Sequence, residues 1–251
     1  MNVKETKKIN INQNNIDIWL LNIKDFNLIN DRDYLSILSE DEREKYHKFK
    51  VNSLRHRFLI NRANLRLILA KYLRINPQEI VFNYSEKGKP SLNFNIHSQK
   101  IYFNLSHKNN YTVYGIGQCN LGIDLEKIDD KVKIENIAKR FFCSEEYQYL
   151  TKLKKEDKFS YFFTLWTIKE AYLKLIGQGL SGGLDSIYIQ EIGDNHNYQI
   201  INNQGNKLEH WMVKTWNILD NYILSIVVNK LEYKFNQSLI FKFFTMDKLD
   251  D

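Results

Sequence analysis

The sequence predicts an α+β protein with two pseudo-symmetric halves, each a small, mostly antiparallel sheet packed on a long helix. Two stretches, residues 53–73 and 159–176, repeat apolar residues at helical spacing. Each is accompanied by short runs with the apolar–polar alternation of half-buried strands. No linker-like segment separates these elements. We therefore expect a polar segment over 1–15, one half over 16–118 and a second half over 119–251.

The elements of the first half follow from local patterns. A helical stretch over residues 31–49 contains Ser39 and Glu42 at the spacing of a capping box, in which side chains satisfy the free amides of the helix start. The long helix over 53–73 is ended by Asn76-Pro77, because the residue before a proline disfavours helical dihedral angles. Strands are expected over 16–21, 80–84, 100–104 and 111–118.

The second half repeats this plan. A strand over residues 121–126 is followed by a helical region over 134–153 and by the long helix over 159–176. Gly177 and Gly179 end that helix, as glycines do after the last helical turn. Further strands are expected over 186–191, 210–215 and 222–228.

Composition limits the function classes. The net charge of +6 and the pI of about 9.0 favour an anionic partner, such as nucleic acid, an acidic protein or a phosphorylated metabolite. Two cysteines without metal-type spacing, Cys119 and Cys143, indicate a reducing, cytoplasmic environment. No apolar run has the length of a membrane span, so we expect a protein without a membrane partner.

Three carboxylates and two lysines are the strongest chemical feature. Asp124 and Glu126 share one face of the strand 121–126, and Glu170 lies on the long helix between Lys169 and Lys174. If the three carboxylates meet about 6 Å apart, each pair repels by roughly 3 kcal/mol at an effective dielectric near 20. A hard divalent cation such as Mg²⁺ would make that cluster tolerable. The alternatives are a solvated strand face and an exposed helical ion pair.

Other polar motifs have two interpretations each. Ser106 and His107, at a strand end, could bond a phosphate or form an ordinary turn. The turn over residues 88–90 could contact a nucleotide. A run of lysines is a solvated face or a docking patch for an acidic partner, and consists of Lys152, Lys154, Lys155 and Lys158.

The order of these motifs resembles the 4′-phosphopantetheinyl transferase superfamily, in particular its surfactin-type (Sfp-like) branch of single chains with two halves. The motifs are Gly88-Lys-Pro90, Asn104-Leu-Ser-His107, Gly122-Ile-Asp-Leu-Glu126, Arg140-Phe-Phe142, Trp166-Thr-Ile-Lys-Glu-Ala171, Lys174 and Gly177-Gln-Gly179-Leu180. The branch of half-length chains that form trimers fits poorly. The resemblance implies the fold of that superfamily, with a metal site at the interface of the halves, and a monomer.

The resemblance also implies roles for individual residues. Asp124, Glu126 and Glu170 match the ligands of Mg²⁺, with Mn²⁺ as the alternative ion. Residues matched to coenzyme A contacts are Lys169 and Lys174 for the pyrophosphate, Ser106 and His107 for the nucleotide phosphates, Gly88, Lys89 and Pro90 for the adenine side, and Lys45 and Arg57 for the 3′-phosphate. Glu42 stands where some relatives have lysine.

The implied reaction transfers 4′-phosphopantetheine from coenzyme A to a serine of an acidic apo acyl or peptidyl carrier protein. Adenosine 3′,5′-bisphosphate is the second product. Glu170 is expected to accept the serine proton, with Glu146 as the second candidate, and Lys174 to protonate the leaving group. Asp124 completes the expected catalytic set. The rivals are a non-catalytic coenzyme A or nucleotide-binding regulator, and a nucleic-acid-binding protein that uses the arginines of the first long helix.

Overall fold

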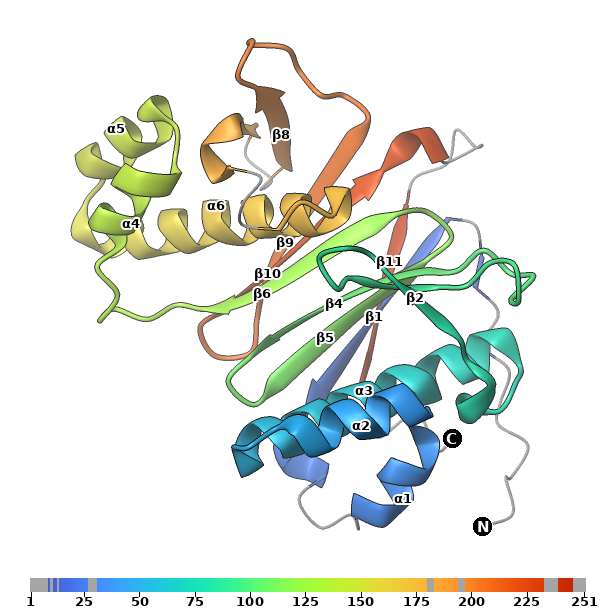
Figure 1. Cartoon of the computed structure of the whole chain (residues 1–251). Helices are drawn as coiled ribbons and strands as arrows, with labels where there is room; N and C mark the ends of the chain where they lie inside the picture. The colour runs from blue at the N-terminus through green and yellow to red at the C-terminus, as the bar shows by residue number, and fades with distance from the viewer. Residues whose placement is uncertain are drawn as a thin grey trace.

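The computed structural model describes residues 9, 11–12, 14–26, 31–179, 183–193, 197–232 and 239–245. Leu180 and most of the predicted polar N-terminal segment therefore lie outside the described residues. Two sheets occupy the middle of the molecule, and one long helix covers the outer side of each, as Figure 1 shows. The predicted α+β class is confirmed.

The first sheet has the strand order β11-β1-β5-β4, with antiparallel pairing except between β1 and β11. Its strands are β1 (Asn15–Asn22), β4 (Tyr102–Lys108), β5 (Tyr111–Gly117) and β11 (Ile240–Thr245). The helices on its side are α1 (Asp31–Ile37), α2 (Glu40–Lys48) and α3 (Asn52–Leu73). A short hairpin, β2 (Phe82–Tyr84) with β3 (Pro90–Leu92), follows α3. The capping box at the start of α2 is confirmed, with Glu42 accepting the Ser39 amide at 3.1 Å.

The second sheet is antiparallel and has the order β6-β10-β9-β8-β7. Its strands are β6 (Leu121–Lys127), β7 (Ile187–Ile192), β8 (Asn197–Asn202), β9 (Trp211–Ile218) and β10 (Tyr222–Asn229). The helices are α4 (Ile134–Phe141), α5 (Ser144–Lys152) and α6 (Lys155–Ile176). Gly177, at φ 73°, ends α6 in the left-handed conformation, as predicted.

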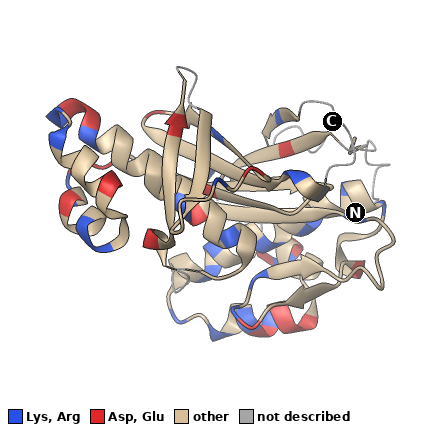
Figure 2. Cartoon of the chain, turned by 90° about the horizontal axis from the view of Figure 1, so that it is seen from above, with Lys and Arg blue, Asp and Glu red and all other residues tan. Residues whose placement is uncertain are grey.

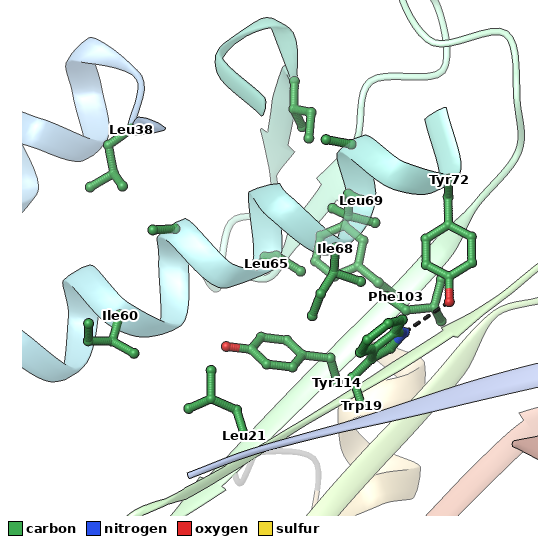
Figure 3. Packing of buried hydrophobic residues seen from close by; sticks show 14 of the residues in the cluster. Trp19, Leu21, Leu38, Ile60, Leu65, Ile68, Leu69, Tyr72, Phe103 and Tyr114 are labelled. Carbon is green, nitrogen blue, oxygen red and sulfur yellow. Dashed lines mark hydrogen bonds between the residues drawn. The ribbon is translucent and has the colours of Figure 1, made fainter. Parts of the chain in front are cut away.

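Strand alternation divides the core into layers. On β1, Trp19 and Leu21 pack toward α3, whereas Ile16 and Ile18 pack toward the second sheet. Figure 3 shows the α3 side, where the Trp19 indole donates to the Tyr72 hydroxyl at 2.9 Å. A third cluster packs α6 on the outer face of the second sheet. The two sheets therefore share one buried layer and hold each other in place.

Three strands were not predicted, β3, β8 and β11. Of these, β3 has only three residues and begins with Pro90. The predicted strand 100–104 is shifted to Tyr102–Lys108, so Ser106 and His107 lie inside β4 and not at a strand end. The largest correction concerns β11, which falls in the predicted second half, 119–251, but pairs with β1 in the first sheet. Its partner is near the other end of the chain, so no local pattern could reveal this pairing.

Candidate active site

A close crossing of β6 and α6 builds the site. A Cβ atom on Gly122 would lie 1.9 Å from the Ala171 carbonyl oxygen, so only glycine permits this approach. Residues of β6 alternate, so Asp124 and Glu126 share the face of Gly122 and point toward α6. Leu125 points to the layer between the sheets.

Asp124 is the centre of this site. Its Oδ1 accepts hydrogen bonds from Ser106 Oγ at 2.8 Å and from Lys174 Nζ at 2.6 Å. Lys174 also donates to Ser106 Oγ at 2.8 Å. Asp124 is only 4% exposed, so the alternative of a solvated strand face is wrong for this residue. The structure thus brings together strands of both sheets and the last turn of α6.

Glu170 belongs to the same electrostatic neighbourhood. Burial first, and then the negative charges of Asp124 and Glu126, raise the pKa of Glu170 to about 7. Lys174 opposes this shift. Glu126 forms an ion pair with Lys108, Oε2 to Nζ, at 2.5 Å. The three predicted carboxylates therefore influence one another, as the sequence indicated.

The donor set fits a divalent cation, although it is not assembled as a metal-binding site. Within the described ranges, no three His, Cys, Asp or Glu side chains are arranged to hold a metal ion. However, Asp124 Oδ2 is buried and has no hydrogen-bond partner in the described part of the chain. An unpaired buried carboxylate oxygen beside two further carboxylates is a suitable set of hard oxygen ligands. In place of a divalent cation, Lys108 and Lys174 supply positive charge to these carboxylates.

Lys108 was not predicted as a site residue. It lies two residues after Ser106 on β4, and alternation therefore places both side chains on one face. The spacing of two residues from Ser106, which is a predicted site residue, could therefore have indicated Lys108 from the sequence.

His107 and Arg57 lie beside a cavity of about 300 Å³ at the first half. Desolvation first, and then the positive charges of Arg57 and Lys174, lower the pKa of His107. The potential here is therefore positive and suits a phosphate. Lys45 lies nearby, with its Nζ 5.6 Å from the centre of the Phe58 ring, which also lines this cavity.

The β2–β3 turn lies against the end of α6. Gly88, Lys89 and Pro90 line a second cavity, of about 240 Å³, together with Lys174. The Lys89 ammonium donates to the Lys174 carbonyl at 2.6 Å and to the Leu175 carbonyl at 3.2 Å. The predicted turn is therefore at the site, and its lysine caps the helix that holds Lys174.

Lys169 is not part of this site, so its predicted contact with pyrophosphate is wrong for this structure. The side chain is fully buried and forms an ion pair with Glu146, Nζ to Oε2, at 2.8 Å. Its Nζ also donates to the carbonyls of Leu184 and Ile187. Glu146 is equally buried and accepts the Ile189 amide at 2.8 Å. Glu146 therefore cannot reach a substrate proton, and its candidacy as a base is also wrong.

The lysine run lies away from the carboxylates. Lys155 begins α6, and at 1.5 Å per residue it lies about 22 Å from Glu170 along the helix axis. Lys158 forms an ion pair with Glu135 at 2.5 Å. Figure 2 shows basic and acidic residues interleaved on the helices at this end. The proposed docking patch is therefore neither purely basic nor next to the site.

The arginines of α3 do not form an outward basic face. Arg66 is 1% exposed, and the Arg62 side chain is 11% exposed. This removes the support for nucleic-acid binding by that helix. No helix among the described residues has both the length and the apolar character needed to cross a bilayer.

The fold and the site define an α+β protein with a carboxylate–lysine centre where β4, β6 and α6 meet, flanked by two cavities whose linings include lysine, arginine and histidine side chains. Two family models match the chain. The model of the 4′-phosphopantetheinyl transferase superfamily covers residues 120–227, and that of the 4′-phosphopantetheinyl transferase N-terminal region covers 30–117.

Three curated relatives agree with this match. HetI of Nostoc sp. is 38% identical over 60% of this chain and 64% of its own length. Sfp of Bacillus subtilis is 32% identical over 62% and 68%. A Synechocystis sp. protein that is provisionally named a 4′-phosphopantetheinyl transferase is 32% identical over 73% and 80%. The chain belongs to the 4′-phosphopantetheinyl transferase superfamily, and the predicted Sfp-like branch is confirmed.

Among solved structures, the holo-[acyl-carrier-protein] synthase of Thermotoga maritima aligns with 45% of this chain and 63% of its own chain. The sequence identity is 19% and the TM-score is 0.36.

Proposed function

We propose that the chain transfers the 4′-phosphopantetheine group of coenzyme A to a serine of an apo carrier protein. The carrying observation is the contact of Asp124 with both Ser106 and Lys174, beside Glu126 and Glu170. This arrangement concentrates acid, base and positive charge at one point between the halves. Phosphoryl-group transfer needs these components, because its transition state is stabilised mainly by position and charge. The names of the relatives favour the same reaction.

Asp124, Glu126 and Glu170 would hold Mg²⁺, or Mn²⁺ in its place. When bound, that ion supplies positive charge for the pyrophosphate of coenzyme A.

The protein's own residues bind and orient the pyrophosphate. Ser106 and Lys174 already share Asp124 Oδ1 as an acceptor, and both can donate to a phosphate oxygen. His107 adds a nitrogen donor in a region of positive potential. Lys174 is only partly buried, with 28% of its side chain exposed, so a ligand can reach it.

Glu170 is proposed as the base. The serine oxygen of the carrier bonds to the phosphorus that bears pantetheine, and the bond from that phosphorus to the bridging oxygen breaks. Adenosine 3′,5′-bisphosphate leaves, with Lys174 supplying a proton or positive charge to the leaving oxygen. Glu170 accepts the serine proton. In the protein without a metal ion, burial and the neighbouring Asp124 carboxylate raise the pKa of Glu170 to about 7.

The partner is proposed to be an acidic apo acyl or peptidyl carrier protein. The net charge of +6 favours association with an acidic surface. The lysine run is remote from Glu170. We therefore propose that the carrier protein contacts a surface closer to Glu170 than the lysine run.

A mass measurement tests the reaction. The protein is mixed with coenzyme A, Mg²⁺ and an apo carrier, and the carrier is weighed. A gain of one phosphopantetheine per carrier is expected, and it should require the divalent ion. Coenzyme A binding without any mass gain, over a panel of apo acyl and peptidyl carriers, would favour the non-catalytic regulator instead.

A further inference from the structure

Asn104 belongs to the motif Asn104-Leu-Ser-His107, but the proposed reaction gives it no role. It lies on β4, and only 7% of its surface is exposed. Its side-chain oxygen Oδ1 accepts a hydrogen bond from the backbone amide of Ile123 on β6 at 3.0 Å. This bond joins the two sheets, because β4 belongs to the first and β6 to the second. It does so one residue before Asp124.

The strand β6 lies at the edge of its sheet, so the backbone groups on its outer side need other partners. Within the described ranges, β10 is its neighbour in the ladder. Ile123 is fully buried, so water cannot satisfy its backbone groups. The amide is satisfied by Asn104, and the carbonyl accepts from Lys174 Nζ at 3.2 Å. Side chains from β4 and from α6 therefore fix the backbone of β6 beside Asp124.

Side chains take the place of a backbone ladder between the two sheets, where β4 and β6 lie side by side (Figure 1). Three residues of β4 that share one face contact β6 in chain order. The pairs are Asn104 with Ile123, Ser106 with Asp124 and Lys108 with Glu126. Of these three contacts, only that of Asn104 reaches the backbone of β6. It therefore holds the strand itself, whereas the other two hold its carboxylates.

We propose that Asn104 is a positioning residue, which holds β6 so that Asp124 meets Ser106 and Lys174, and thereby sets the affinity of the carboxylates for a divalent cation. Asn104 acts through the Ile123 backbone. This inference rests on the proposed function, since the cation is the one that the carboxylates would hold there. Removal of an outer partner that orients a metal ligand typically costs about 10- to 100-fold in metal affinity or activity.

Asn104→Ala tests the inference in three measurements. Hydrogen exchange of the Ile123 amide in the metal-free protein should become at least about tenfold faster, because the amide loses its acceptor. Titration with Mn²⁺, followed by electron paramagnetic resonance, should show binding that is weaker by about 10- to 100-fold, and kcat should fall by a similar factor. The affinity of the metal-free protein for coenzyme A should stay unchanged.

Asn64→Ala is the matched control. Asn64 is also buried, and its Nδ2 donates to the Ile60 carbonyl within α3 at 2.8 Å. Loss of this bond should lower the melting temperature, while the Mn²⁺ affinity and kcat stay as in the wild-type protein. Asn104→Ser has a shorter side chain that keeps a hydroxyl group. It should show the losses of Asn104→Ala to a smaller degree, and it serves if the alanine variant does not fold.

Three outcomes would overturn the inference. Unchanged exchange of the Ile123 amide would show that Asn104 does not hold β6. Faster exchange with unchanged Mn²⁺ affinity and kcat would make the bond a purely structural one. Weaker binding of coenzyme A with unchanged Mn²⁺ affinity would make Asn104 a ligand contact. Absence of transfer by the wild-type protein in the mass assay counts against the proposed function, whereas these outcomes count against the role of Asn104 alone.

Discussion

Lys174 Nζ lies 2.6 Å from Asp124 Oδ1, and this ion pair joins the last turn of α6 to the strand that crosses it. Ser106, from the other sheet, donates to the same carboxylate oxygen. Side chains from both halves of the molecule therefore contact one charged oxygen atom. Loss of that atom should affect chemistry much more than folding.

Asp124→Asn tests this expectation. The variant keeps the shape of the side chain but loses the negative charge that Lys174 and the proposed metal ion require. We expect phosphopantetheine transfer to fall by at least about 100-fold, on the scale of removing one group that stabilises charge in a transition state. The melting temperature should change little, because the amide still accepts from Ser106. Full transfer with unchanged rate would remove Asp124 from the catalytic set.

Lys169→Met should destabilise the folded protein, whereas Lys174→Met should not. Breaking the buried pair leaves Glu146 charged and without its partner, at a cost of about 3–5 kcal/mol in the free energy of unfolding. Denaturant unfolding measures this loss. The double variant Lys169→Met/Glu146→Gln should recover part of it, since glutamine can still accept the Ile189 amide. If Lys169→Met unfolds like the wild type, the buried pair is not the structural element described.

Lys89→Met should slow transfer without unfolding the protein. The Lys89 ammonium satisfies the carbonyls of Lys174 and Leu175, so its loss should loosen the turn that positions Lys174. We expect kcat to fall by about tenfold, the equivalent of 1.4 kcal/mol. Lys100→Met, at an exposed lysine, is the control and should behave as wild type. A change in KM alone would instead indicate direct contact of Lys89 with the nucleotide.

Gly122→Ala should strongly destabilise the protein. The new methyl group would overlap the Ala171 carbonyl oxygen, and because both are backbone-fixed, β6 and α6 must separate. The expected cost is about 3 kcal/mol or more. In Gly115→Ala the closest atom is the flexible Leu121 Cδ1, at 2.9 Å, so a smaller loss of about 1 kcal/mol is expected. Urea unfolding compares the two, and equal losses would contradict the close crossing.

Glu170 should make the metal-free protein less stable as the pH rises. Its pKa increases from 4.5 to about 7 on folding, so the folded protein retains a proton that the unfolded chain has released within that window. Stability must therefore fall between about pH 4.5 and 7. Glu170→Gln lacks this term, and its melting temperature relative to wild type should rise between pH 5 and pH 8. A difference that does not vary with pH would show that Glu170 titrates normally.

Much of the site could be predicted from the sequence, because its residues belong to short motifs whose geometry depends on neighbouring residues in the chain. Asp124 and Glu126 follow from strand alternation, and Gly177 from the helix end. The partners of long side chains could not be predicted in the same way. Lys169 and Lys174 are five residues apart on one helix, yet Lys169 turns to Glu146 and Lys174 to Asp124. Which lysine faces which carboxylate depends on helix rotation against the sheet, and this is a property of packing and not of spacing.

The pairing of β11 with β1 has a consequence for synthesis of the protein. During translation, β1 leaves the ribosome early, but the strand that covers its open edge is made only after all of β6 to β10. The nascent first sheet therefore has an unpaired edge for most of elongation. Expressing residues 1–118 alone would make that exposure permanent, and such a fragment should aggregate unless a peptide with the β11 sequence is supplied.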